Sequence, residues 1–215
     1  MPLLALFASR DKGILKEKKF KEIIIYLENF HFAYNAILAR RPNLIDPIYT
    51  KFAISLRKCT TASEVNDVIQ NKLFLPLDSL FPQYSDFESK FIELAYSKKD
   101  LPSNMKTKYA VNKLFCYYDE KDVPDDEGTI EHIIPDNDDM SHNIGNLILL
   151  EQGLNNDAGD KIFSVKIPYY KRSSYKWVNE FVDNHSSWNQ SDIPTRAKEL
   201  ARIYYTKVMG RQDGQ

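Results

Sequence analysis

The sequence contains few cysteines and no long hydrophobic segment. The two cysteines, Cys59 and Cys116, lie far apart in apolar surroundings and cannot supply the ligands of a tetrahedral zinc site. We interpret them as buried thiols of a protein in the reducing cytoplasm. No apolar run approaches the roughly 18 residues of a membrane-spanning helix. The apolar start, residues 1–7, has no basic segment before it, so we expect neither a signal peptide nor contact with a membrane.

The composition excludes a disordered chain, with 43% hydrophobic and 27% charged residues, but the charge is unevenly distributed. Residues 1–116 contain 18 Lys+Arg and 12 Asp+Glu, a net charge of +6. Residues 117–160 contain 1 and 13, a net charge of −12, and residues 161–215 contain 10 and 5, a net charge of +5. Two interpretations of the acidic segment stay open: a solvated loop, or a cation site flanked by phosphate-binding surfaces.

The first half of the chain has the apolar spacing of amphipathic helices. This spacing predicts helices over residues 16–38, 63–73, 87–96 and 106–118. The acidic segment 118–128 follows, and the pattern changes after it. We therefore expect a helical region over residues 1–128 and a second domain over residues 129–215.

The second domain begins with two β-prone runs, residues 129–134 and 146–150, joined by a polar loop. This pattern predicts a hairpin, and a helix could begin at about residue 151 or 154. Adjacent side chains of a strand point to opposite faces, so Glu131 and His132 could serve one site only in an unusual geometry.

These residues suit phosphodiester hydrolysis. A histidine with a pKa near neutrality can take the proton of an attacking water. A hard divalent cation can stabilise the negative charge that develops on the phosphate, and it prefers carboxylate and amide oxygens.

The segment Glu131-His132-Ile133-Ile134-Pro135 closely resembles the first strand of the ββα-metal (HNH) nuclease motif. Asn146 lies 14 residues after His132 and Asn155 lies 9 residues further on, as in the HNH domains of RNA-guided CRISPR nucleases. The resemblance implies that His132 is the general base and that Glu131 and Asn155 bind Mg²⁺, or alternatively Mn²⁺. It also implies that Asn146 fixes the loop and the orientation of the histidine. Asn156 stays open as an alternative to Asn155.

Further residues extend the resemblance to the C-terminal domain of GmrSD-type restriction enzymes, among them Ser173, Trp188 and the segment Ile144-Gly145-Asn146-Leu147. The fold implied is α+β and mostly α: a helical region before an HNH core that further helices enclose. The function implied is a DNA endonuclease of antiphage restriction, whose full-length members carry an upstream NTP-binding module of ParB-like fold. We therefore expect a fragment, a split subunit or a truncated homologue. The alternative is a nucleic-acid-binding or regulatory partner whose nuclease site is inactive without another module.

Several basic residues of the second domain are candidates for phosphate contacts, because Lys and Arg supply most sequence-independent DNA affinity. They are Lys161, Lys166, Lys171, Arg172 and Arg196.

Two other groups allow a simpler interpretation. We interpret His142 as a bystander of the loop. The carboxylates of Asp136, Asp138 and Asp139 form either a solvated loop or a second metal site. Asp160 and Lys161 either assist in binding metal or phosphate or form a pair on a helix surface, and we favour the pair.

Overall fold

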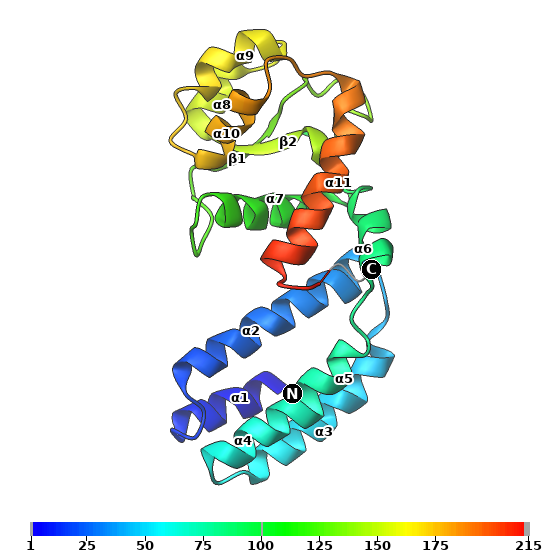
Figure 1. Ribbon diagram of the computed structural model, residues 1–215, viewed down its shortest axis with the longest axis vertical. Helices are drawn as coiled ribbons and strands as arrows, with labels where there is room; N and C mark the ends of the chain where they lie inside the picture. Colours follow the sequence, from blue (N-terminus) through cyan, green and yellow to red (C-terminus); the bar gives the residue numbers. More distant parts are fainter. Residues whose placement is uncertain (1, 100, 213–215) are drawn as a thin grey trace. The chain divides into compact units, whose positions relative to one another are not determined.

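The computed structural model describes residues 2–99 and 101–212, which form two compact units (Figure 1). The division falls between Gln83 and Tyr84. None of the helices in the described residues is long and apolar enough to cross a membrane.

The first unit is helical throughout. Helix α2 begins at Glu17 and buries Phe20, Ile23, Leu27 and Phe30 along one face, as the apolar spacing predicts. Its elements are α1 (Pro2–Asp11), α2 (Glu17–His31), the π-helical turn Phe32–Ile37, the 3₁₀ turn Pro42–Leu44, α3 (Ile45–Lys58), α4 (Ala62–Ile69), the π-helical turn Gln70–Phe74 and α5 (Leu75–Asp78).

Helix α4 begins earlier than its apolar spacing predicts. Its N-cap is Thr61, whose hydroxyl accepts a hydrogen bond from the Glu64 amide, while the Glu64 carboxylate accepts one from the Thr61 amide. This capping box satisfies two of the free amides at the start of the helix and so fixes its first residue.

The second unit is α+β and mostly α, which confirms the predicted fold class. The antiparallel hairpin of β1 and β2 pairs Glu131 with Ile148 and His132 with Leu147. The elements are α6 (Tyr84–Phe91), α7 (Asn104–Tyr118), β1 (Gly128–His132), the 3₁₀ turn Ile144–Asn146, β2 (Leu147–Glu151), α8 (Gln152–Ala158), α9 (Phe163–Tyr170), α10 (Lys176–Asn184), the 3₁₀ turn Gln190–Asp192, α11 (Ile193–Ile203) and the π-helical turn Tyr204–Val208.

Strand β2 lies at the centre of the hydrophobic core of this unit. Its residues Leu147 to Leu150 are completely buried, because α7 and α10 pack against the strand and α8 contacts both strands (Figure 1). Helix α7 therefore shares a core with the hairpin and α6 packs against α11, although both helices lie upstream of the boundary expected near residue 128.

The helix predicted over residues 87–96 is wrong in its second half. Helix α6 ends at Phe91, and residues 95–98 run extended beside the loop between the strands, with Ala95 bridged to Asn143. The amide of Ile144 donates to the Leu94 carbonyl at 2.8 Å, and the amide of Tyr96 donates to the His142 carbonyl at 2.9 Å. These non-local hydrogen bonds replace the helical ones.

Gly145 allows α11 to approach the start of β2. A Cβ atom at this position would lie 2.1 Å from the Ile193 carbonyl oxygen and 3.0 Å from the Ala197 amide nitrogen. We expect Gly145→Ala to lower the free energy of unfolding by about 1–3 kcal/mol, because the backbone of α11 must shift to admit the methyl group. Urea denaturation measures this change.

Gly153→Ala is the matched control, because a Cβ atom at Gly153 in α8 would meet nothing within 4 Å. This variant should be as stable as the parent protein or slightly more stable, since alanine favours the helix. Equal destabilisation by the two substitutions would contradict the packing argument.

Candidate active site

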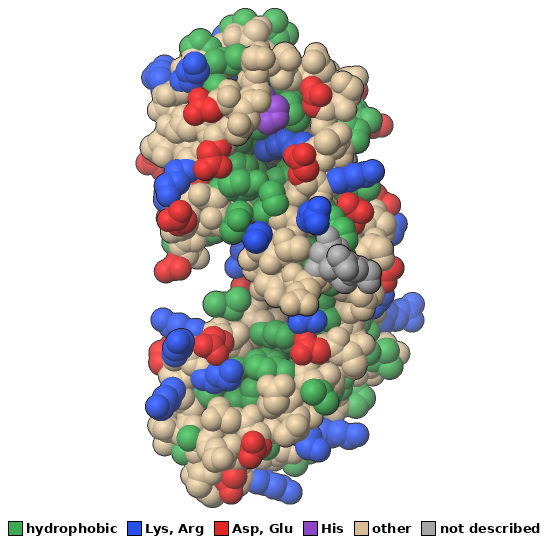
Figure 2. Space-filling view, viewed as in Figure 1, with side chains coloured by type: hydrophobic (Ala, Val, Ile, Leu, Met, Phe, Trp, Pro, Cys, Tyr) green, Lys and Arg blue, Asp and Glu red, His purple; other side chains and the backbone are tan. Residues whose placement is uncertain are grey.

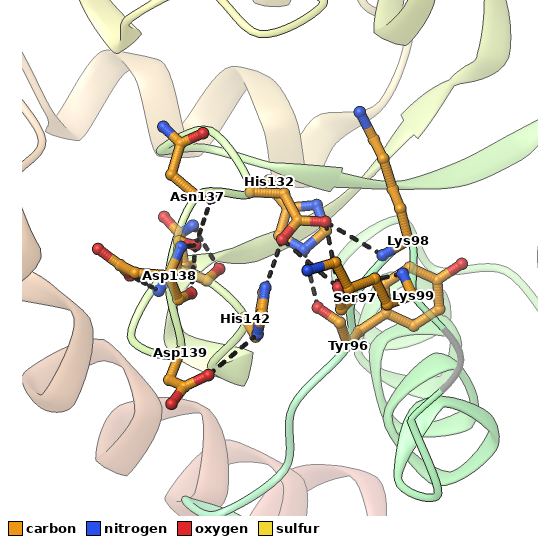
Figure 3. Close-up of polar contacts among 12 residues, drawn as sticks. Tyr96, Ser97, Lys98, Lys99, His132, Asn137, Asp138, Asp139 and His142 are labelled. Carbon is orange, nitrogen blue, oxygen red and sulfur yellow. Dashed lines mark hydrogen bonds and ion pairs between the residues drawn. The ribbon is translucent and has the colours of Figure 1, made fainter.

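His132 ends strand β1, and its ring is held by a backbone carbonyl. The side chain is 4% exposed, and Nε2 lies 2.8 Å from the carbonyl oxygen of Tyr96 (Figure 3). A carbonyl can only accept, so Nε2 carries the proton of this bond, and Nδ1 is the acceptor atom of the neutral ring. Burial lowers the pKa of His132, and the Tyr96 carbonyl and the Asp136 carboxylate oppose this. The ring is therefore neutral near pH 7 and can accept a proton.

Asp136 and His142 lie beside this histidine. The His142 Nε2 atom contacts Asp136 Oδ1, and the Asp136 carboxylate also accepts hydrogen bonds from the Ser97 hydroxyl at 3.3 Å and the Lys98 amide at 3.1 Å. The ring centroids of His132 and His142 are 6.3 Å apart. Burial acts to raise the pKa of Asp136, but the Lys98 amide and the two histidines outweigh it, so the pKa lies below its ordinary value.

Asp136 is therefore not part of a solvated loop, because its side chain is only 10% exposed. Asp138 and Asp139 are at the surface, as that interpretation requires. His142, which the sequence does not distinguish from a loop residue, holds the Asp136 carboxylate close to His132.

Glu131 points into the protein and is paired with a lysine. Its Oε1 atom accepts hydrogen bonds from Lys166 Nζ and from the Tyr170 hydroxyl, both at 2.7 Å. The ammonium also donates to the carbonyl of His132 at 2.6 Å. Burial raises the pKa of Glu131, while the Lys166 ammonium opposes the rise.

Asn146 is completely buried and fixes the loop. Its Oδ1 atom accepts from the Ile134 amide at 2.9 Å and from Trp188 Nε1 at 3.2 Å. Its Nδ2 atom donates to the carbonyls of Ile134 and Ser141, both at 2.8 Å. The contact that orients His132 comes from Tyr96, so Asn146 acts on the loop and not directly on the ring.

Asn155 lies on α8 and faces strand β1. Its Nδ2 atom donates to Thr129 Oγ1 at 2.9 Å and to the Ile130 carbonyl at 3.1 Å. Within residues 2–99 and 101–212, no group donates a hydrogen bond to its Oδ1 atom, which leaves this oxygen available to a ligand.

A single cavity of about 360 Å³ brings most of these residues together. Asn156 lines it as well, so it stays the alternative to Asn155. Lys98, from the segment before α7, is a lining residue that the sequence motif does not include. The charged and amide side chains of the lining are Lys98, Glu131, His132, Asp136, Gln152, Asn155, Asn156, Asp160 and Lys166.

The five basic candidates fall into two groups. Lys161, Lys171 and Arg172 are at the surface, where DNA can reach them. Lys166 and Arg196 are 1% and 6% exposed. The Arg196 guanidinium donates to the carbonyls of Gly145 and Leu147 at 2.8 and 2.9 Å, so its position supports a role inside the protein and not a phosphate contact.

Comparison with known proteins identifies the family. No curated protein matches the chain. The family model described as the C-terminal domain of GmrSD restriction endonucleases matches residues 81–203. This match covers more than half of the chain, from just before α6 to the end of α11, and includes every residue of the cavity. The chain therefore belongs to the family of the GmrSD restriction endonuclease C-terminal domain.

Proposed function

We propose that the protein is a metal-dependent DNA endonuclease of the HNH type that acts in antiphage restriction. Membership of a restriction endonuclease family supports the nuclease activity. The observation that carries the HNH assignment is the state of His132: a buried, neutral imidazole with Nδ1 as its acceptor atom, in a cavity shared with Glu131 and Asn155.

In this mechanism His132 takes the proton of the attacking water on Nδ1. The Tyr96 carbonyl holds Nε2–H throughout, so the ring keeps its orientation. The imidazolium that forms is stabilised by the ionised Asp136 carboxylate, which His142, Ser97 and the Lys98 amide keep in place. A bound divalent cation would supply the charge that stabilises the phosphate and the leaving oxygen.

The donor atoms fit a hard cation in type. The free Oδ1 atom of Asn155 and the carboxylate of Glu131 are oxygens of the kind that Mg²⁺ takes, but Oε1 of Glu131 already accepts hydrogen bonds from Lys166 and Tyr170. Among the described residues, no group of three or more His, Cys, Asp or Glu side chains is arranged to hold a metal. A Mg²⁺ ion that keeps several water ligands needs only one or two protein oxygens, so we expect weak binding by Glu131 and Asn155.

The alternative function also has an observation in its favour. The Lys166 ammonium already neutralises Glu131, as it would in a site that becomes active only with another module. The family resemblance implies an NTP-binding, ParB-like module for this role, and we assign recognition of the target DNA to it. On the face drawn in Figure 2, basic and acidic side chains are interspersed, which supports weak, salt-sensitive DNA binding by this chain.

A plasmid-nicking assay with Mg²⁺, with Mn²⁺ and with a chelator tests the proposed function. Cleavage that needs the cation and stops with the chelator is the expected result. Cleavage at the same rate in the chelator would contradict metal dependence. Cleavage that appears only after addition of a ParB-like partner would favour the alternative.

The metal ligands are tested by titration calorimetry with Mn²⁺. We expect Glu131→Ala and Asn155→Ala each to weaken Mn²⁺ binding, because each removes an oxygen ligand. Asn156→Ala is the matched control and should bind as the parent protein does. Unchanged affinity in the first two variants would contradict the ligand assignment, and a loss only in Asn156→Ala would move the ligand by one residue.

A further inference from the structure

Lys98 is placed by hydrogen bonds of the backbone that leads to its side chain. Its own amide donates to Asp136 at 3.1 Å, and the amide of the preceding Ser97 donates to Asn104 Oδ1 at 3.1 Å. These bonds fix the backbone at Lys98. The Lys98 side chain extends from it, away from Tyr96 and Ser97 (Figure 3). The Lys98 side chain is 70% exposed, and its Nζ lies 3.2 Å from Asp160 Oδ1 across the cavity that His132 lines.

Lys98 differs from the other described charged residues of the cavity in being an exposed cation. The described lining contains three carboxylates, on Glu131, Asp136 and Asp160, and two ammonium groups, on Lys98 and Lys166. The Lys166 ammonium is buried and donates to Glu131 and to the carbonyl of His132. Lys98 is therefore the exposed cation among the described lining residues.

The lining has more carboxylates than ammonium groups, so it repels the negative charge of a phosphodiester. Binding of the phosphodiester therefore requires an ammonium group that can leave its carboxylate partner and contact the phosphate. The ion pair between Lys98 and Asp160 is exposed on both sides, and such pairs are weak because water competes for both charges. The ammonium can exchange Asp160 for a phosphate oxygen at little cost. Lys161, Lys171 and Arg172 do not line the cavity and can reach only phosphates outside it.

We propose that Lys98 binds the phosphate to be cut, and that Asp160 holds its ammonium over the cavity until substrate enters. The proposal rests on the proposed nuclease function and adds a substrate-binding residue to it. A charge-assisted hydrogen bond from Lys98 to a non-bridging phosphate oxygen would also stabilise the negative charge that develops during hydrolysis.

The experiment compares Lys98→Ala with Lys99→Ala, its matched control. Lys99 is also exposed and is adjacent in the chain, but it does not line the cavity. The Lys99 amide donates to the Ser97 hydroxyl, and the Lys99 carbonyl accepts from the Asn104 side chain. Both are backbone hydrogen bonds, so Lys99→Ala keeps them. Binding of a short DNA duplex is measured over a range of salt concentrations with Mg²⁺ present, in a His132→Ala background so that the duplex stays intact. Cleavage is measured with His132 present.

We expect Lys98→Ala to reduce the salt slope of duplex binding by about 0.9, the value for one lost phosphate contact. Its cleavage rate should fall about 10- to 100-fold, as for loss of a charge-assisted hydrogen bond, while Lys98→Arg keeps most of the activity. Lys99→Ala should change neither quantity. Equal changes in Lys98→Ala and Lys99→Ala would overturn the proposal.

The same data separate this proposal from the proposed function. A parent protein that binds the duplex with the expected Lys98-dependent slope but never cuts it would remove the nuclease function and leave Lys98 as a phosphate-binding residue. A parent protein that cuts DNA with a slope independent of Lys98 would do the reverse. No duplex binding by any variant would overturn the role of Lys98.

Discussion

His132→Ala is expected to lower the rate of plasmid nicking by about 10²- to 10⁴-fold, the usual contribution of a general base. The substitution removes the acceptor atom Nδ1 of a side chain that lines the cavity, and it leaves the hairpin paired through its backbone. Circular dichroism and urea denaturation should show that the variant is folded. An alanine variant that cuts at the parent rate would show that another group deprotonates the water.

His142→Ala is the control for this variant, and we expect it to lose far less activity. It removes a contact to Asp136 but leaves His132 in its bond to the Tyr96 carbonyl. The pH profile provides a second check. Burial lowers the pKa of His132, and a base works only when unprotonated, so activity should persist just below the ordinary histidine pKa and fall at lower pH.

Lys166→Met is expected to destabilise the protein by about 3–5 kcal/mol, the range for breaking one side of a buried ion pair. The Lys166 and Glu131 side chains are 1% and 5% exposed, so the variant leaves a buried carboxylate without its cation. Loss of the ammonium also removes the hydrogen bond to the His132 carbonyl. Urea denaturation measures the loss.

Two further variants test whether the loss of stability in Lys166→Met comes from the broken ion pair. The double variant Glu131→Gln with Lys166→Met should recover part of the lost stability, because no charge remains buried. Lys171→Met removes an exposed lysine at the end of the same helix, α9, and should change stability by less than about 0.5 kcal/mol. A loss in Lys166→Met no larger than that in Lys171→Met would contradict the ion-pair argument.

The sequence predicted the part of the site that is local in the chain. His132, Asn146 and Asn155 lie within a single hairpin and helix, so their spacing indicates the hairpin, the helix after it and the family. The fold class is the one that the family resemblance implies. The predicted roles of Glu131 as a metal ligand and of His132 as a base stay predictions.

The rest of the site comes from residues that are distant in the sequence. Tyr96 reaches His132, and Lys98 reaches the cavity, only because residues 95–98 leave the helical path and pair with the loop before β2. Helical spacing of apolar residues carries no signal for such a departure. Lys166 and Arg196 resembled phosphate ligands because charge alone does not reveal burial; their partners, a carboxylate and backbone carbonyls, are visible only in three dimensions.

His132 is held by a main-chain carbonyl, and this determines which positions near the site we expect to vary among related sequences. The Tyr96 ring lies against His132 but contributes nothing to that hydrogen bond, so another side chain at position 96 can keep the tautomer. Purifying selection should fall instead on Ser103, Thr107 and Asn104, whose side chains anchor the carbonyls of Ala95 and Ser97. In a comparison of homologues, the residue that touches the base should be variable, and the residues that hold its backbone should not.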